Sequence, residues 1–134
     1  MSTIVRFEDI EAWQTVRKLT SQIYEITRHG EFARDYSLCD QMRRATVSVM
    51  SNIAEGFESR TQPLFKDFLS RAIASAGELR TQLYVERDIG YLNQDEFPQL
   101  FELCDKCSRQ IARFIQYLIH QSQAVRDEGI IYNV

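Results

Sequence analysis

Apolar residues recur at steps of three and four along four stretches of the chain, the spacing that places them on one face of an amphipathic α-helix. The first stretch runs from about Glu8 to Arg28, and Gly30 follows it. The second ends near Phe57, and the third and fourth begin close to Pro63 and Asn93. The pattern therefore predicts four helices of about 20 to 28 residues joined by short turns.

Each predicted helix has an apolar seam that can be buried only against the other helices. In chain order, the seams are Trp13, Val16, Thr20, Ile23 and Thr27; Leu38, Met42, Ala45, Val49 and Asn52; Phe65, Leu69, Ala72, Ala76, Leu79 and Leu83; and Phe97, Leu100, Cys104, Cys107, Ile111, Phe114 and Leu118. Because the connections are short, consecutive helices must run antiparallel. We expect an all-α fold, an antiparallel up-down-up-down four-helix bundle.

The bundle is predicted to occupy residues 1–124, followed by a C-terminal tail at residues 125–134. The tail ends in the sequence GIIYNV, which is apolar but has no helical period and no capping residue. It is interpreted either as a frayed terminus or as a segment that docks on a groove.

Capping residues predict where two of the helices start. Ser37 followed by Asp40 resembles a capping box for the second helix, and Asn93 followed by Glu96 resembles one for the fourth. Gly90 is expected to end the third helix.

Composition supports one helical domain with no strong charge. The 134 residues include only two prolines and five glycines, and the formal net charge is -3. This charge excludes the strong positive field of a protein that coats DNA without sequence preference. The first residues contain neither a signal peptide nor a transmembrane pattern. We expect a cytoplasmic protein without a membrane partner.

The pair Cys104 and Cys107 spells C-x-x-C, which in other contexts marks a redox pair or half of a zinc site. Both cysteines lie on an apolar seam, and only Cys39, His29 and His120 could add ligands. Core packing is therefore favoured over a metal or thiol enzyme. No nucleophile motif, phosphate-binding glycine pattern or Glu-x-x-His sequence occurs. We expect no catalytic residue, no bound metal and no cofactor.

Polar residues follow helical spacing on the second and third helices, so two polar ridges could meet. The ridges are Arg44, Ser48, Asn52 and Glu55 on one helix, and Ser75, Glu78, Gln82 and Glu86 on the other. One interpretation is an internal hydrogen-bonded network that fixes the register of the helices, because buried polar groups need partners. The alternative is a subunit or ligand surface.

Arginine is the main basic residue and suits the pairing of planar phosphates or carboxylates. The candidates for nucleic-acid binding are Arg43, Arg44, Arg80, Arg87, Arg109 and Arg113. For any one of them, a solvated surface arginine paired with a carboxylate is the simpler interpretation. A ring-shaped oligomer would repeat a modest patch and make it a strong cationic surface.

Four segments carry a resemblance to a known family. They are FEDIEAW at 7–13, QMRRATVSVMSNIAEG at 41–56, FLSRAIAS with ELRTQL within 68–83, and RDIGYL at 87–92. The sequence resembles the four helix bundle protein family found in intervening sequences of bacterial 23S ribosomal RNA genes. This family includes the accessory variability determinant of diversity-generating retroelements. The resemblance spans about residues 6–119.

The resemblance implies a four-helix protomer that assembles into a homopentameric ring without enzymatic activity. In the retroelement branch the ring binds nucleic acid and a reverse transcriptase. Three positions depart from the family pattern. Met50 stands where proline is usual, which predicts a less kinked second helix. Arg80 stands where the family usually has glutamate, and Glu86 stands where alanine is common.

Together these patterns predict a non-enzymatic homo-oligomer, an adaptor or accessory protein that binds RNA or DNA through its arginines. The alternative is a protein-binding scaffold with no nucleic-acid contact, which would present the acidic fourth helix and the tail to a partner protein.

Overall fold

The computed structural model describes the backbone of residues 4–128 and the side chains up to residue 121. The described chain contains four α-helices and two short 3-10 helices, and no strand. The α-helices are α1 (Glu11–Ile26), α2 (Tyr36–Glu58), α3 (Gln62–Asp88) and α4 (Glu96–Glu128), and the 3-10 helices are Phe7–Asp9 and Phe32–Arg34. The all-α prediction is confirmed.

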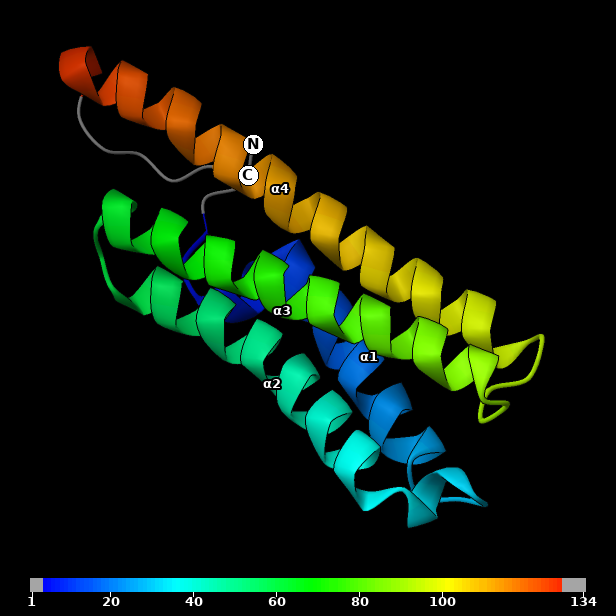
Figure 1. Ribbon diagram of the computed structural model, residues 1–134. Coiled ribbons are helices and arrows are strands. Elements are labelled where there is room, and N and C mark those ends of the chain that lie inside the picture. The colour runs from blue at the N-terminus through cyan, green and yellow to red at the C-terminus, as the bar shows by residue number, and fades with distance from the viewer. Residues whose placement is uncertain (1–3, 129–134) are drawn as a thin grey trace.

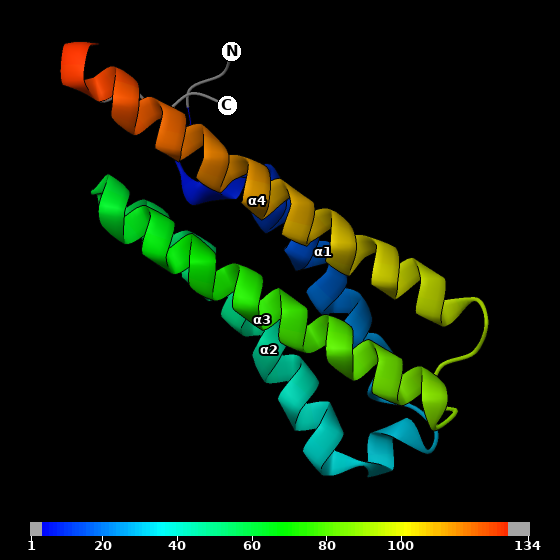
Figure 2. The same ribbon diagram turned by 45° about the horizontal axis from the view of Figure 1, so that its top comes forward.

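Consecutive helices run antiparallel and lie side by side, as Figures 1 and 2 show. Contacts between α2 and α3 include Ser48 with Ser75 near the middle and Gly56 beside Phe65 at one end. Only residues 59–61 separate these two helices. Packing of α1 against both α2 and α4 closes the four-helix arrangement.

The predicted seams form the core. Nearly all seam residues of α3 and α4 are buried, and Val16, Ile23, Met42, Val49 and Ile53 line the same interior from α1 and α2. Trp13, Thr20 and Asn52 are only half-buried. The core therefore follows the three-four periodicity, and these three seam positions lie at its edge.

The predicted start of α2 is wrong by two residues. Asp35 is the N-cap, and its Oδ1 accepts a hydrogen bond from the backbone N–H of Leu38 at 3.2 Å. Ser37 and Asp40 both lie inside the helix and are exposed, and Asp40 pairs with Arg44 instead. The Ser-x-x-Asp spacing was thus misleading because an equally good capping residue precedes it.

The connection between α3 and α4 has the predicted signals. Gly90 adopts a positive φ of 86°, and hydrogen bonds run from Gly90 N–H to the carbonyl of Arg87 and from Tyr91 N–H to that of Glu86. These bonds form a Schellman motif. Asn93 Oδ1 accepts from the N–H of Glu96 at 2.8 Å, and Glu96 Oε1 accepts from the N–H of Asn93 at 3.0 Å. The predicted capping box is confirmed.

Other boundaries moved by a few residues. α1 begins at Glu11 because the preceding residues form a 3-10 helix. α2 continues through Met50 without a break. α4 continues to Glu128, beyond the predicted end at residue 124, and the GIIYNV segment at 129–134 lies outside the described residues. Within the described residues, no helix is long and apolar enough to cross a membrane.

Candidate nucleic-acid interface

Helices α3 and α4 meet at an outer seam that carries cationic and aromatic side chains together. We call this seam the α3/α4 strip; it consists of Arg80, Tyr84 and Arg87 on α3 and Phe97, Phe101, Asp105 and Arg109 on α4. Helices α3 and α4 lie side by side and run antiparallel (Figure 1), and ring contacts and an ion pair join the two rows. The steps of three and four within each row keep its members on one face.

Three aromatic rings occupy the end of the strip nearest the α3–α4 connection. The ring of Tyr84 lies 5.5 Å from that of Phe97 and 5.4 Å from that of Phe101, and the two phenylalanine rings are 5.4 Å apart. The Arg87 guanidinium lies over this group, 4.7 Å from the Phe97 ring centre and 5.1 Å from the Tyr84 ring centre. A cation is therefore held against an aromatic surface.

Two more arginines converge further along the strip. Arg80 and Arg109 both pair with Asp105, at 3.6 Å and 3.5 Å. Arg109 also pairs with Glu102 at 3.0 Å. The shared carboxylate draws guanidinium groups from two helices to one place, although it also offsets part of their charge.

The ion pairs of the strip are weak in energy because they are open to water. The exposed fractions of the arginine side chains are 41% for Arg80, 47% for Arg87 and 55% for Arg109. Exposed pairs of this kind typically contribute at most about 1 kcal/mol each. An incoming anion can therefore replace the carboxylate partners at little cost.

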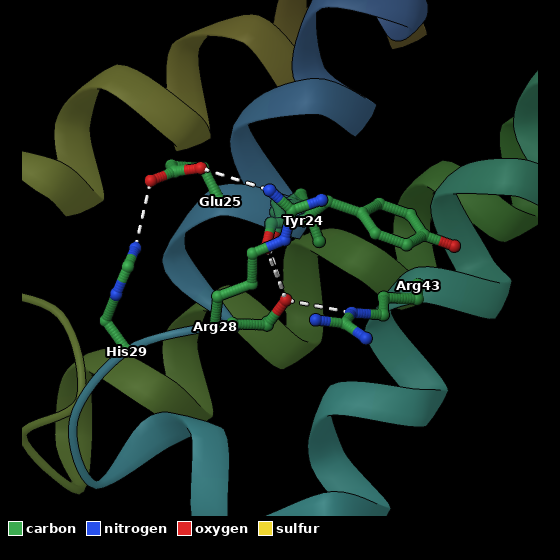
Figure 3. Close-up of polar contacts among 7 residues, drawn as sticks. Tyr24, Glu25, Arg28, His29 and Arg43 are labelled. Atoms are coloured by element: carbon green, nitrogen blue, oxygen red, sulfur yellow. Dashed lines mark hydrogen bonds and ion pairs between the residues drawn. The ribbon is translucent and has the colours of Figure 1, made fainter.

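The predicted arginines on the other side of the bundle are placed differently (Figure 3). Arg43 lies with its guanidinium 4.7 Å from the Tyr24 ring centre and donates from Nε to Thr27 Oγ1 at 2.9 Å. At the end of α1, Glu25 accepts one hydrogen bond from Arg28 at 3.5 Å and pairs with His29 at 2.9 Å. The His29 contact lowers the pKa of the Glu25 carboxyl. Here arginine serves to join α2 to α1.

The six predicted arginines do not form one surface within the protomer. Arg44 projects outward from α2 and pairs with Asp40 at 2.9 Å. Arg113 lines a small pocket between α1 and α4, opposite Glu11. The structure therefore brings Arg80, Arg87 and Arg109 together on the strip, whereas Arg43 and Arg44 line a separate hollow beside Tyr24 and Asp40.

The predicted polar network is smaller than the two ridges. Ser48 Oγ and Ser75 Oγ are 2.9 Å apart, and Asn52 Nδ2 donates to Ser48 Oγ at 3.1 Å. Gln82 Nε2 donates to Glu78 Oε1 at 3.3 Å along α3 itself. Arg44 and Glu55 are exposed and lie outside the network. They lie at the outer edge of the ridge, which corrects the interpretation that all four α2 residues form an internal network.

The cysteines pack as core residues and point to different helices. Cys104 Sγ donates to the carbonyl of Ala76 on α3, and Cys107 Sγ donates to that of Ala12 on α1. Burial raises the pKa of the Cys104 thiol to about 11 and that of Cys107 to about 12. Thiols with such pKa values are poor nucleophiles at neutral pH. Among the described residues, no cluster of three or more metal-ligating side chains occurs.

Glu86 is a carboxyl group in the core of the bundle. Its side chain is fully buried, and neither oxygen has a hydrogen-bond partner among the described residues. Burial, with a smaller contribution from Asp35, raises its pKa to about 8. The group is thus mostly protonated at neutral pH.

Sequence reasoning missed the aromatic part of the strip. Phe97 was assigned only to the core seam, and Tyr84 and Phe101 were not singled out. The available signal was the spacing of aromatic and arginine residues by three or four on both helices, at positions 84 and 87 and at 97 and 101. It could be interpreted only once α3 and α4 were known to be neighbours at this end.

The profile of a family described as 23S rRNA-intervening sequence protein matches residues 8–113, which include every residue of the strip. The chain belongs to this family. A solved structure of a protein with unknown function, from the S23 ribosomal protein family of Bacteroides thetaiotaomicron, has the same fold with a TM-score of 0.73. The two sequences are 14% identical, and the aligned region covers 78% of this chain and 95% of the chain in the solved structure. No curated protein matches the chain.

The region that matches the 23S rRNA-intervening sequence protein family contains α1, α2, α3 and just over half of α4. The solved structure shares the fold at low sequence identity, so its similarity concerns backbone arrangement alone. The side chains of the strip must therefore be interpreted from their own geometry.

Proposed function

We propose that the chain is a non-catalytic, homo-oligomeric, cytoplasmic accessory protein that binds RNA through the α3/α4 strip. The observation that carries this proposal is the convergence of Arg80, Arg87 and Arg109 on one exposed surface beside three aromatic rings. Guanidinium groups bind phosphate oxygens through two parallel N–H donors. The strip offers three such groups from two rigid helices.

The net charge of -3 does not prevent this role if the strip is repeated. A homopentameric ring, the assembly implied by the family resemblance, would carry five strips. Phosphates bound to several strips of one ring would gain from effective concentration without any new contact. Exposed apolar side chains outside the strip, Val85 on α3, Ile89 just after its end and Val47 on α2, are available for contacts between protomers.

The assembly is tested by mass in solution. We expect size-exclusion chromatography with light scattering to give about five times the 15.7 kDa mass of the chain. A mass equal to that of the chain at micromolar concentration would contradict the ring and remove the multivalent part of the proposal.

RNA binding is tested by neutralising two arginines of the strip. In the double variant Arg80→Gln and Arg87→Gln, we expect the affinity for structured RNA to fall by about tenfold at 0.1 M salt. The slope of log K against log salt should decrease in magnitude by about two, because two cations beside the bound phosphates are lost. Fluorescence anisotropy between about 50 and 200 mM salt measures both quantities.

A matched control separates the strip from net charge. Arg28→Gln with Arg71→Gln removes the same charge from two arginines that are equally exposed, at 61% each, and paired with carboxylates on other faces. We expect it to bind RNA like the wild type. Equal losses in both variants would refute a localised strip, and absence of wild-type binding at low salt would favour the protein-binding scaffold.

A further inference from the structure

A hollow of about 420 Å³ adjoins the aromatic end of the strip, where α3 ends and α4 begins. It is lined by Arg87, Leu92, Asn93, Gln94, Phe97 and Pro98. Phe97 and Arg87 belong both to this hollow and to the strip, so a molecule bound along the strip reaches the hollow without a gap. Figure 2 shows the loop between α3 and α4 at the end of the bundle opposite the α2–α3 turn.

The walls of the hollow suit a flat heterocycle. Leu92, Phe97 and Pro98 supply apolar surface, and the Arg87 guanidinium lies against the Phe97 ring. Aromatic rings and guanidinium planes are the surfaces on which unpaired bases stack in proteins that bind single strands.

Polar groups at the rim of the hollow can pair with the edge of a base. The Oδ1 atom of Asn93 is already occupied by the N–H groups of Asp95 and Glu96. Its amide N–H groups make no hydrogen bond with a described residue and can donate to a base carbonyl. The exposed Gln94 amide adds a donor and an acceptor.

The hollow is held in shape before any ligand binds. The Schellman motif at Gly90 fixes one side, and the reciprocal hydrogen bonds between Asn93 and Glu96 fix the other. A site built on such a turn loses little conformational freedom on binding. This rigidity distinguishes the hollow from a gap between mobile side chains.

We propose that the hollow holds one unpaired base of a single RNA strand while Arg80 and Arg109 bind its neighbouring phosphates. This inference rests on the proposed function and adds the class of RNA, which is single-stranded. Helical geometry places Arg80 about two turns, or roughly 10 Å, from Arg87 along α3. Bases within a duplex are stacked and paired, so a duplex could contact only the arginines.

The experiment compares three ligands on the full chain: an oligouridylate of about 12 nucleotides, the same strand with abasic sites, and a blunt RNA duplex. We expect wild-type protein to bind the oligouridylate about tenfold more tightly than the abasic strand, whose phosphates are unchanged. In Phe97→Leu this preference should disappear, while affinity for the duplex stays at the wild-type value.

A matched variant controls for the loss of a ring beneath an arginine. Phe68 also lies on a helix face under a guanidinium, with Arg71 at 5.1 Å, but it is remote from the hollow. Phe68→Leu should therefore bind all three ligands like the wild type. Circular dichroism establishes that both variants fold, and Arg87→Gln, which removes the guanidinium wall of the hollow, replaces Phe97→Leu if that variant is unfolded.

The outcomes distinguish the two proposals. Equal wild-type affinity for the oligouridylate and the abasic strand would overturn the base site and leave phosphate binding by the strip intact. A wild-type preference that persists in Phe97→Leu, or in Arg87→Gln where that variant replaces it, would also overturn it. Absence of binding to all three ligands would refute both the base site and the proposed function.

Discussion

Replacing Glu86 by glutamine is expected to raise the free energy of unfolding by about 4 to 5 kcal/mol at pH 8 and above. The wild-type carboxyl is fully buried without a hydrogen-bond partner among the described residues, and its pKa is raised to about 8. Ionisation in that position leaves a charge with neither water nor a cation beside it. Glutamine has the same shape and carries no charge at any pH.

The pH dependence follows from the two states of Glu86. In the unfolded chain the carboxyl has its ordinary pKa of 4.5, and in the fold the pKa is about 8. Between these values the unfolded chain releases a proton that the folded chain retains, so stability falls as the pH rises. Below pH 4.5 and above pH 8 this contribution is constant. Urea unfolding followed by circular dichroism between pH 5 and 9 measures the slope.

A suitable control for Glu86→Gln is Glu55→Gln, which changes the same chemical group at an exposed position of α2. We expect its unfolding curve to follow that of the wild type at each pH. If Glu86→Gln also keeps the wild-type slope, the buried carboxyl is not the source of the pH dependence.

Gly56→Ala is expected to lower the free energy of unfolding by about 2 kcal/mol. A Cβ atom at this position would lie 2.9 Å from Phe65 Cδ1 and 2.9 Å from Phe68 Cβ. Phe65 is itself buried, and the Cβ of Phe68 is fixed to the backbone of α3, so neither can move aside freely. In the variant, α2 and α3 must move apart at the end where the short turn at residues 59–61 joins them.

The second helical glycine provides the comparison. Around Gly77 of α3, a Cβ atom would meet nothing within 4 Å. Gly77→Ala should therefore stabilise the protein by about 1 kcal/mol, because alanine favours the helix. Thermal or urea unfolding of the two variants measures the difference. Similar stabilities for both would show that α2 and α3 are not packed as closely as described.

The helices and their buried faces could be predicted because long runs of three-four spacing leave few alternatives. The residues at which the helices begin and end were harder to predict. Ser37 and Asp35 are both good capping residues two positions apart, and only the path of the preceding chain decides between them. Asp95 is a second capping residue near Asn93, but only Asn93 is followed by a glutamate three residues later, and its capping box was predicted correctly.

The candidate site was predictable only in part, since it depends on contacts between helices. The arginine positions were visible in the sequence, but their grouping was not. Arg80 and Arg109 meet through Asp105, a residue that no motif marks. Likewise, the positions of Tyr84 and Phe101 gain meaning only from the antiparallel pairing of α3 with α4. The helical period predicts which face of a helix is buried, but it does not predict which other helix packs against that face.

The turn at residues 59–61 also has a consequence for the order of folding. Because it is so short, α2 and α3 can meet with little loss of loop entropy, and their contacts are close in sequence. The contacts between α1 and α4, such as Cys107 with Ala12, join distant parts of the chain. We therefore expect the α2–α3 hairpin to nucleate folding and the α1–α4 seam to close last.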